Sequence, residues 1–163
     1  MSFDKPEDFY QVYDEHRTYA SPDLRKKHLR QYDDQIWSPA ACLPEMAFLE
    51  IGCGTGIFLN YLKHKGVQRF AGVDLDPHVL DVMPADLAEA VTIGDVWAYL
   101  EQIRTQAPFD RIVLLDVLEH FSPYEGVRLL RQLDGVLSQD GRIIVRVPNL
   151  SSPWGAQYQF HDL

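Results

Sequence analysis

The stretch of sequence that decides the fold runs from Phe48 to Gly56 and reads Phe-Leu-Glu-Ile-Gly-Cys-Gly-Thr-Gly. Its first half predicts a buried strand, and its glycines predict a tight turn into a helix that starts near Ile57. Glycine has no Cβ, so the backbone and a ligand can approach each other closely. In an open parallel sheet, a turn of this kind lies at the carboxyl edge, where nucleotide-sized ligands bind.

The spacing of Gly52, Gly54 and Gly56, and the residues that follow them, argue against a nucleoside-triphosphate site. A phosphate-binding Walker loop continues with Lys-Ser or Lys-Thr, where this chain has Ile57 and Phe58. A dinucleotide-binding loop has the spacing G-x-G-x-x-G, whereas this loop reads G-x-G-x-G. A nucleoside triphosphatase is therefore not expected. An NAD-dependent Rossmann oxidoreductase stays an alternative, although the loop does not have the glycine spacing of that class.

Strand-like and helix-like segments alternate along the rest of the chain. After the first strand, we expect strands at residues 70–74, 90–93, 111–115 and 142–147. We expect helices at residues 24–36, 57–65, 77–83, 96–106 and 124–137, the first of them started by Ser21-Pro22-Asp23. The alternation predicts an α/β fold with a Rossmann-like, doubly wound, mainly parallel sheet in three αβα layers.

Five motifs in a fixed order carry a family resemblance. They are residues 50–56 (E-I-G-C-G-T-G), 72–77 (G-V-D-L-D-P), 93–96 (I-G-D-V), 109–120 (F-D-R-I-V-L-L-D-V-L-E-H) and 140–149 (D-G-R-I-I-V-R-V-P-N). Together they resemble class I S-adenosylmethionine-dependent methyltransferases over about residues 47–149. The stretch after the fifth strand, residues 147–155, is similar to a subgroup that acts on small molecules and in glycan pathways.

The resemblance implies a division of the chain and a cofactor. Residues 1–46 would form an N-terminal helical arm or lid, and residues 47–163 an S-adenosylmethionine-binding methyltransferase domain. The family's sheet normally has seven strands, so the chain is expected to lack the last two and to be C-terminally truncated. The exposed sheet edge could then favour a homodimer. The cofactor would be S-adenosyl-L-methionine, and the product S-adenosyl-L-homocysteine.

The resemblance also assigns cofactor-binding residues. The glycines Gly52, Gly54 and Gly56 would pass close to the methionine part of the cofactor, and Glu50 would hold its ammonium group. Asp74 would accept hydrogen bonds from the ribose hydroxyls, and Leu75 would pack on adenine. Asp95 and the backbone of Val96 would bind the adenine ring, and Asp116 would face the methionine end.

Structural roles are open for the same side chains. Glu50 could be a salt-bridge partner, Asp74 a helix cap, and Asp95 the N-cap of the following helix, a role that is compatible with binding adenine. Asp76, which precedes Pro77, is better explained as a cap than as a ligand-binding residue.

His120 and Asp116 are the candidate catalytic residues. An imidazole can take a proton near neutral pH, which a hydroxyl acceptor requires as it attacks. A packing role for His120 is the alternative. Further candidates near the active site are His16, Tyr158 and His161, and a lid could be formed by Tyr10, Tyr13, Arg17 and Tyr19.

Composition limits the partners. The formal net charge of −9 argues against nucleic acid, whose binding depends on phosphate neutralisation by Lys and Arg. Cys42 and Cys53 have no metal-ligand spacing and suggest a reducing, cytoplasmic setting, with no metal site expected. No apolar run is long enough to predict a transmembrane segment.

The expected function is methyl transfer to a small-molecule or glycan-precursor acceptor at a hydroxyl. The resemblance also covers relatives that methylate amino groups of adenine, cytosine or glutamine, but their Asn/Asp-Pro-Pro-aromatic motif is absent after Leu115. A non-catalytic, S-adenosylmethionine-binding partner subunit or regulatory module stays a second possibility, because an intact glycine loop favours binding and not necessarily turnover.

Overall fold

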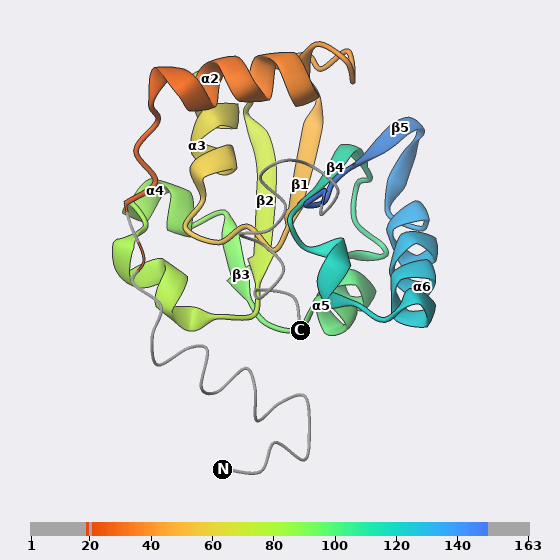
Figure 1. The fold of residues 1–163 in the computed structure, drawn as a ribbon. Coiled ribbons are helices and arrows are strands. Elements are labelled where there is room, and N and C mark those ends of the chain that lie inside the picture. The colour runs from red at the N-terminus through yellow and green to blue at the C-terminus, as the bar shows by residue number, and fades with distance from the viewer. Residues whose placement is uncertain (1–18, 20, 150–163) are drawn as a thin grey trace.

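The computed structural model, which describes Tyr19 and residues 21–149, contains one sheet of five parallel strands in the order β3-β2-β1-β4-β5 (Figure 1). These strands are β1 (Ala47–Ile51), β2 (Arg69–Asp74), β3 (Val91–Ile93), β4 (Phe109–Leu115) and β5 (Leu137–Arg146). The strand order reverses between β1 and β4, which are neighbours at the centre of the sheet. Ligands of open α/β sheets bind at such a reversal, outside the carboxyl ends of the strands.

Helices cover both faces of the sheet and give the predicted three layers. They are α2 (Lys26–Tyr32), the π-helical turn η1 (Asp33–Trp37), α3 (Ile57–His64), η2 (Pro77–Val82), α4 (Ala85–Ala88), α5 (Val96–Ile103), η3 (Leu118–His120) and α6 (Pro123–Asp134). One hydrophobic cluster joins the sheet to α2, α3, η2 and α4, and a second joins it to α5 and α6. The predicted Rossmann-like parallel fold is confirmed.

Alternation along β1 distributes its side chains between the two clusters. Phe48 packs in the cluster under α2 and α3, whereas Leu49 and Ile51 pack in the cluster under α5 and α6. Because successive strand residues point to opposite faces, Glu50 lies on the same face as Phe48. The sequence therefore places one carboxylate on an otherwise apolar face, under the helix that follows the glycine turn.

The first helix begins later than its expected start signal. Ser21 hydrogen-bonds the side chain of Asp23 instead of capping a helix, and Arg25, with φ −98° and ψ 156°, is still extended. The helix therefore begins at Lys26 and continues as the π-helical turn to Trp37. Its Tyr32 packs edge-on against Phe58 of α3, with ring centroids 5.2 Å apart. In Figure 1, α2 runs across the top of the molecule, above α3.

The last helix ends earlier than expected, and the last strand begins earlier. α6 ends at Asp134, and Leu137, which was expected in the helix, already pairs with Phe109 of β4. The pairing register shifts between Phe109 and Arg111, where β5 carries extra residues around Gly141. A Cβ at Gly141 would lie 2.5 Å from Leu137 Cγ, so glycine permits this irregularity. The apolar periodicity of Leu133 and Leu137 continued across this boundary and concealed it.

Candidate functional site

The glycine turn after β1 has the backbone conformation that its sequence predicts. Gly52, Gly54 and Gly56 all have positive φ angles, +66°, +51° and +82°. A Cβ on Gly52 would lie 2.5 Å from Val117 Cγ2, so this glycine lets the turn pack against the loop after β4. A Cβ on Gly54 would meet no described atom within 4 Å. The turn is therefore packed on one side and open at Gly54.

Glu50 is a buried carboxylate with an unpartnered oxygen. The residue is only 3% exposed, and Oε2 has no hydrogen-bond partner among the described residues. Burial and then the nearby charge of Asp74 raise the pKa of Glu50 well above its usual range, while Arg146 acts in the opposite direction. A buried polar atom without a partner costs about 1–3 kcal/mol, and more when charged, so this oxygen is suited to a ligand donor.

Asp74, at the end of β2, connects the glycine turn to the second strand. Its Oδ2 accepts a hydrogen bond from Gly54 N at 2.7 Å, and its Oδ1 accepts one from Asp76 N at 3.0 Å. Each carboxylate oxygen has a second lone pair, so the group can still accept bonds from a diol. Asp76 caps η2 through His78 N, at 2.9 Å, which confirms its expected capping role.

The residues expected to contact adenine lie at the ends of β2 and β3. Leu75 is 70% exposed, so its side chain is accessible to a ligand. Asp95 is the N-cap of α5, since its Oδ1 accepts bonds from Trp97 N at 2.9 Å and Ala98 N at 3.1 Å. The capping alternative is thus confirmed, and Oδ2 of Asp95 is not used in the cap. Val96 is the first residue of α5 and is partly buried.

Asp116 forms an ion pair that the sequence did not reveal. Arg146, the last residue of β5, donates from Nη2 to Asp116 Oδ2 at 2.5 Å and from Nε to Oδ1 at 3.4 Å. The backbone N–H of Asp116 also donates to the carbonyl of Arg146, at 2.9 Å. Asp116 has a positive φ of 58°, which is rare for a residue with a side chain. The pair holds the ends of β4 and β5 together in this conformation.

His120 is exposed at the end of η3, four residues after Asp116. Its backbone N–H donates to Val117 O at 3.1 Å, so the short helical turn fixes its backbone. Both candidate catalytic residues therefore belong to the loop that follows β4. The further candidates His16, Tyr158 and His161, and the expected lid residues Tyr10, Tyr13 and Arg17, lie outside the described residues.

Two side chains from the N-terminal segment reach this region. The Tyr19 hydroxyl donates to Asp76 Oδ2, so this member of the expected lid contacts the loop after β2. Tyr32 is buried between α2 and α3, and burial followed by the charge of Glu50 raises its pKa to about 12. No motif surrounds Tyr32, and the motif at residues 140–149 contains Arg146 without indicating its role; the pairing of β5 with β4 brings Arg146 to Asp116.

These residues fit S-adenosylmethionine. A sulfonium nucleoside with an amino-acid end needs an acceptor for its ammonium group, an open backbone surface, acceptors for a diol and an apolar contact for its base. Glu50, Gly54, Asp74 and Leu75 supply these features in that order. Within residues 21–149 and Tyr19, no group of three or more His, Cys, Asp or Glu side chains could hold a metal ion, and no helix could span a membrane.

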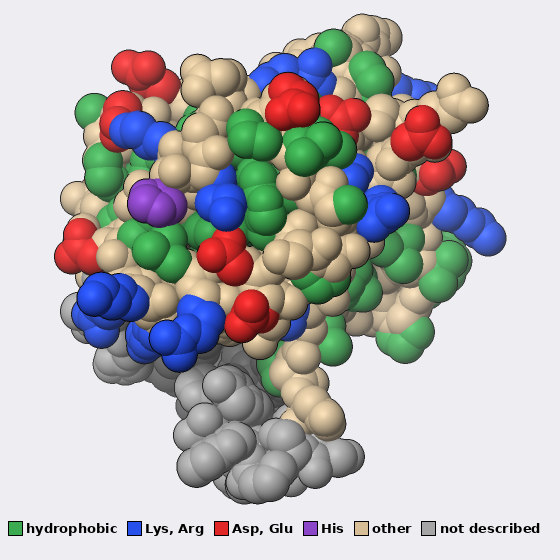
Figure 2. All heavy atoms as spheres, turned by 90° about the horizontal axis from the view of Figure 1, so that it is seen from above, with side chains coloured by type: hydrophobic (Ala, Val, Ile, Leu, Met, Phe, Trp, Pro, Cys, Tyr) green, Lys and Arg blue, Asp and Glu red, His purple; other side chains and the backbone are tan. Residues whose placement is uncertain are grey.

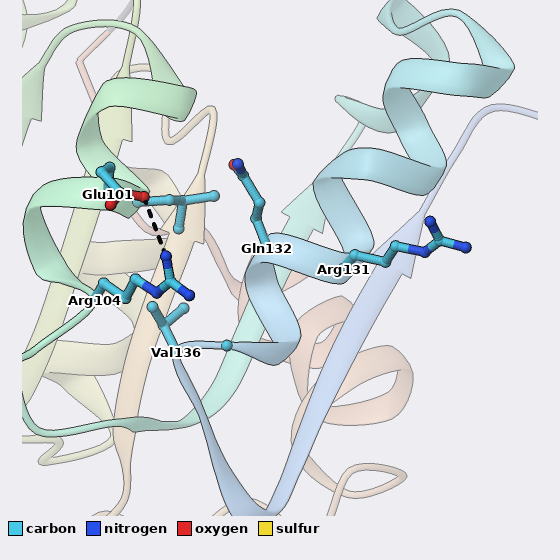
Figure 3. A pocket seen from close by; sticks show the side chains of 7 residues that line it. Glu101, Arg104, Arg131, Gln132 and Val136 are labelled. Carbon is cyan, nitrogen blue, oxygen red and sulfur yellow. Dashed lines mark ion pairs between the residues drawn. The ribbon is translucent and has the colours of Figure 1, made fainter.

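A hollow lies at the opposite edge of the sheet, between the ends of α5 and α6 (Figure 3). It has a volume of about 140 Å³ and is lined by Leu100, Glu101, Arg104, Arg131, Gln132, Gly135 and Val136. Arg104 Nη1 is 3.7 Å from Glu101 Oε2, and both side chains are about 70% exposed. These helix ends lead into the starts of β4 and β5, so the hollow is separate from the glycine turn.

The surface above α2 carries basic and acidic side chains interspersed with each other (Figure 2). Like-charged side chains do not form one continuous field there. Non-specific attraction to nucleic acid depends on a concentrated basic patch, so this face gives no support to such a partner.

Comparison with known proteins agrees with this geometry. A family model described as a methyltransferase domain matches residues 13–162. No curated protein matches the chain. A structure of an S-adenosylmethionine-dependent methyltransferase from Archaeoglobus fulgidus is similar, with a TM-score of 0.68 and 23% identity, over 94% of this chain and 64% of that one.

Two further structures have the same fold. An S-adenosylmethionine-dependent methyltransferase from Clostridium acetobutylicum has a TM-score of 0.60 and 15% identity, over 92% of this chain and 60% of that one. Coclaurine N-methyltransferase, solved with N-methylheliamine and S-adenosylhomocysteine, has a TM-score of 0.58 and 18% identity, over 78% and 38%. The chain thus spans less than two thirds of these proteins. The match over nearly its whole length shows that the chain belongs to the methyltransferase-domain family.

Proposed function

We propose that the chain binds S-adenosyl-L-methionine and transfers its methyl group to a hydroxyl of a small-molecule or glycan-precursor acceptor, releasing S-adenosyl-L-homocysteine. The observation that carries the proposal is the buried, unpartnered Oε2 of Glu50 beside the open backbone at Gly54. Because the chain belongs to the methyltransferase-domain family, we infer that the ligand of this arrangement is S-adenosylmethionine. Two structural relatives, coclaurine N-methyltransferase and PKMT2 from Rickettsia typhi, were solved with S-adenosylhomocysteine.

Each residue at the carboxyl edge then has a defined binding role. Glu50 accepts hydrogen bonds from the ammonium group, and Gly52, Gly54 and Gly56 let the backbone approach the methionine chain. Asp74 accepts bonds from the ribose hydroxyls while it holds Gly54 N, and Leu75 covers one face of the base. Oδ2 of Asp95 and the backbone of Val96 recognise the edge of adenine, while Oδ1 of Asp95 caps α5.

The bound cofactor supplies an electrophilic methyl group on a sulfonium, so the chain needs to orient the acceptor and remove its proton. Alignment of two reacting groups can lower a barrier by roughly 7–11 kcal/mol in ideal cases. His120, exposed in the loop after β4, takes the proton from the acceptor hydroxyl. Asp116 in the same loop orients the acceptor, since its carboxylate is fixed by Arg146.

The setting of the protein is part of the proposal. Cys42 and Cys53 are both unpaired and buried, which supports a reducing compartment such as the cytoplasm. We retain the division into an arm of residues 1–46 and a domain of residues 47–163, and the contact of Tyr19 with Asp76 supports a lid role for the arm. A homodimer through β5, the edge strand of the described sheet, is supported by the exposed Val145 and Val147.

Titration calorimetry on the whole chain tests the proposal, with S-adenosylmethionine and S-adenosylhomocysteine as ligands and NAD as the control. We expect micromolar affinity for the first two and none for NAD. A folded chain that binds neither nucleoside contradicts the proposal, and binding of NAD alone would support the oxidoreductase alternative.

The second candidate function is a cofactor-binding module without turnover. The observation that favours it is the engagement of both carboxylate oxygens of Asp116 by Arg146, which leaves His120 as the one strong candidate for proton transfer among the described residues. His120→Ala separates the two functions once an acceptor is found. A loss of turnover with unchanged cofactor affinity supports the enzyme, whereas equal losses in both indicate a structural role for His120.

A further inference from the structure

Among the described residues, the carboxyl edge of the sheet is strongly acidic and has a single strong cation, Arg146. The strand ends and the loops at residues 52–56, 75–84, 94–95, 116–122 and 147–149 contain no Lys or Arg apart from Arg146. The carboxylates there are Glu50, Asp74, Asp76, Asp81, Asp95, Asp116 and Glu119. A ligand with a carboxylate of its own therefore finds one guanidinium on this part of the described edge, and repulsion elsewhere.

Arg146 lies on the same face of the sheet as Glu50. In the sheet, Glu50 of β1 is paired with Val113 of β4, and Leu115 of β4 is paired with Arg146 of β5. Val113 and Leu115 are two residues apart on β4 and both pack in the cluster under α2 and α3. The side chains of paired residues in a parallel sheet share a face, so Glu50 and Arg146 both emerge under α2 and α3.

The two side chains are near each other without forming an ion pair. β4 separates their strands, and each strand-to-strand step is about 4.8 Å, so their backbones are roughly 10 Å apart across the sheet. Burial raises the pKa of Glu50 and of Tyr32, and Arg146 lies close enough to oppose part of each rise. Within the described chain, however, its salt bridge is with Asp116, and Oε2 of Glu50 stays unpartnered. Glu50 and Arg146 thus lie apart on one face of the sheet, with space between the two side chains for the charged groups of a ligand.

Arg146 also keeps unused donors. A guanidinium has five N–H groups, and the bonds to Asp116 come from Nε and Nη2. Both N–H groups of Nη1 and one of Nη2 make no hydrogen bond within the described part of the chain, and the side chain is 32% exposed. Planar guanidinium groups bind carboxylates well through two parallel N–H donors. Arg146 can therefore bind a second carboxylate without releasing Asp116.

We propose that Arg146 binds the methionine carboxylate of S-adenosylmethionine while Glu50 binds its ammonium group, so that the two side chains recognise the amino-acid end of the cofactor as a zwitterion. The inference rests on the proposed function and assigns its cofactor site a residue from the fifth strand. Asp116 is then a positioning residue, because it holds the guanidinium at the strand end. The net charge of a bound amino-acid end is zero, which suits an edge with one guanidinium and an opposed buried carboxylate.

The test compares three nucleosides that differ only at this end, by titration calorimetry on the whole chain. S-adenosylhomocysteine has both groups, its decarboxylated analogue lacks the carboxylate, and 5′-methylthioadenosine lacks the amino-acid end. For the wild type, we expect S-adenosylhomocysteine to bind roughly 10- to 100-fold more tightly than the decarboxylated analogue, the range for one charge-assisted contact. In Arg146→Gln that preference falls to about twofold or less, and the affinity for 5′-methylthioadenosine stays within about twofold.

Three further variants control for structural effects. Arg142→Gln removes an exposed arginine from the same strand and should leave the preference intact. Arg146→Lys should restore part of it, because the charge is kept and the bidentate geometry is lost. Asp116→Asn should lower the preference without abolishing it, because Arg146 keeps its charge and loses the carboxylate that positions it. Thermal melts of the wild type and the four variants check that each is folded.

Three outcomes count against the inference, and they are distinguishable. If Arg146→Gln weakens all three nucleosides equally, Arg146 acts on the shape of the edge and does not contact the carboxylate. If the variant keeps the wild-type preference, another residue binds the carboxylate. If the folded wild type binds none of the three, the proposed function itself fails, and this assignment fails with it.

Discussion

Two buried charged residues lie on neighbouring central strands, and the structure treats them in opposite ways. Arg111, near the start of β4, is 4% exposed, and Glu50, near the end of β1, is 3% exposed. Arg111 donates from Nε to Ala40 O at 2.9 Å, from Nη1 to Asp110 O at 2.6 Å and from Nη2 to Ala41 O at 3.3 Å. Oε2 of Glu50 has no partner among the described residues.

The difference separates a charged side chain that is hydrogen-bonded within the fold from one that we propose to be functional. Arg111 satisfies the carbonyls of the segment that leads from η1 into β1, so its charge is used within the fold. Glu50 lies one residue after Leu49 and two before the glycine turn, at the end of the sheet where ligands bind. Buried polar groups in native proteins are almost always hydrogen-bonded, and our proposal assigns the cofactor as the partner of this oxygen.

The largest effect on stability is expected from Arg111→Met. The substitution keeps the apolar stem but leaves the carbonyls of Ala40 and Ala41 without this donor, at about 1–3 kcal/mol each. We expect the free energy of unfolding to fall by about 4 kcal/mol, measured by urea denaturation. Arg142→Met is the matched control, because Arg142 is the register partner of Arg111 but is exposed and makes one 3.4 Å bond to Pro39 O. Its cost should be below about 1 kcal/mol; equal costs for the two would remove the contrast with Glu50.

The next largest effect is on binding, and it comes from Gly54→Val. The branched side chain would occupy the open space at Gly54, and we expect the affinity for S-adenosylhomocysteine to fall at least about 100-fold, or about 2.8 kcal/mol. Backbone strain alone is controlled by Gly66→Val, since Gly66 also has a positive φ, 83°, with nothing within 4 Å of its Cβ position. Gly66 follows α3 at its far end. If both variants bind the nucleoside normally, the turn does not face the ligand.

Asp74→Ala is expected to weaken cofactor binding by about 1–3 kcal/mol, because a charged acceptor is lost. Asp74 also holds Gly54 N, so part of this loss comes from the shape of the turn. Asp81→Ala removes a carboxylate from η2 whose side chain is 72% exposed, and it should leave the affinity unchanged within about twofold. Unchanged calorimetric affinity in Asp74→Ala would reject the ribose-binding role.

The sequence predicted the parts of this picture that depend on local patterns. The glycine turn was identified from residues adjacent in the chain, and the position of Asp74 followed from the end of an apolar run. The fold class followed from alternation, and the five-stranded order agrees with it. The cap at Asp76 was predicted from a carboxylate before proline, which is again local chemistry.

The parts that were missed depend on contacts between distant residues. Arg146 reaches Asp116 only because β5 pairs with β4, and the irregular register of that pairing has no sequence signal. The unsatisfied oxygen of Glu50 depends on its burial beneath α2, whose start the Ser21-Pro22-Asp23 signal misplaced. The roles of individual site residues, His120 above all, are still predictions, because they depend on ligands as well as on the fold.

The last expected effect is a pH dependence, which is small at each pH step, and it tests the buried carboxylate of Glu50 directly. In the unfolded chain a glutamate titrates near pH 4.3, whereas burial and Asp74 raise the pKa of Glu50 in the folded chain. Below about pH 4.3 the Glu50 carboxyl is protonated in both states, so it does not lower the stability of the folded protein. As the pH rises above that value, the unfolded state releases its proton first, so the stability of the wild type falls until the folded pKa is reached.

Glu50→Gln cannot titrate and keeps nearly the same shape, so the comparison isolates this one group. We expect the variant to gain on the wild type by up to about 1.4 kcal/mol for each pH unit above 4.3, the limit for a single proton. Urea denaturation of both proteins at pH 5, 6 and 7 measures the difference in the free energy of unfolding, in which the contributions of other titrating groups, such as Asp33, cancel.

The same substitution should weaken S-adenosylmethionine binding, because an amide does not attract an ammonium group as a carboxylate does. A protein that becomes more stable and binds less well shows that the charge is held for the ligand. A difference that does not change with pH, or a loss of stability like that of Arg111→Met, would show that Glu50 has a partner within the fold.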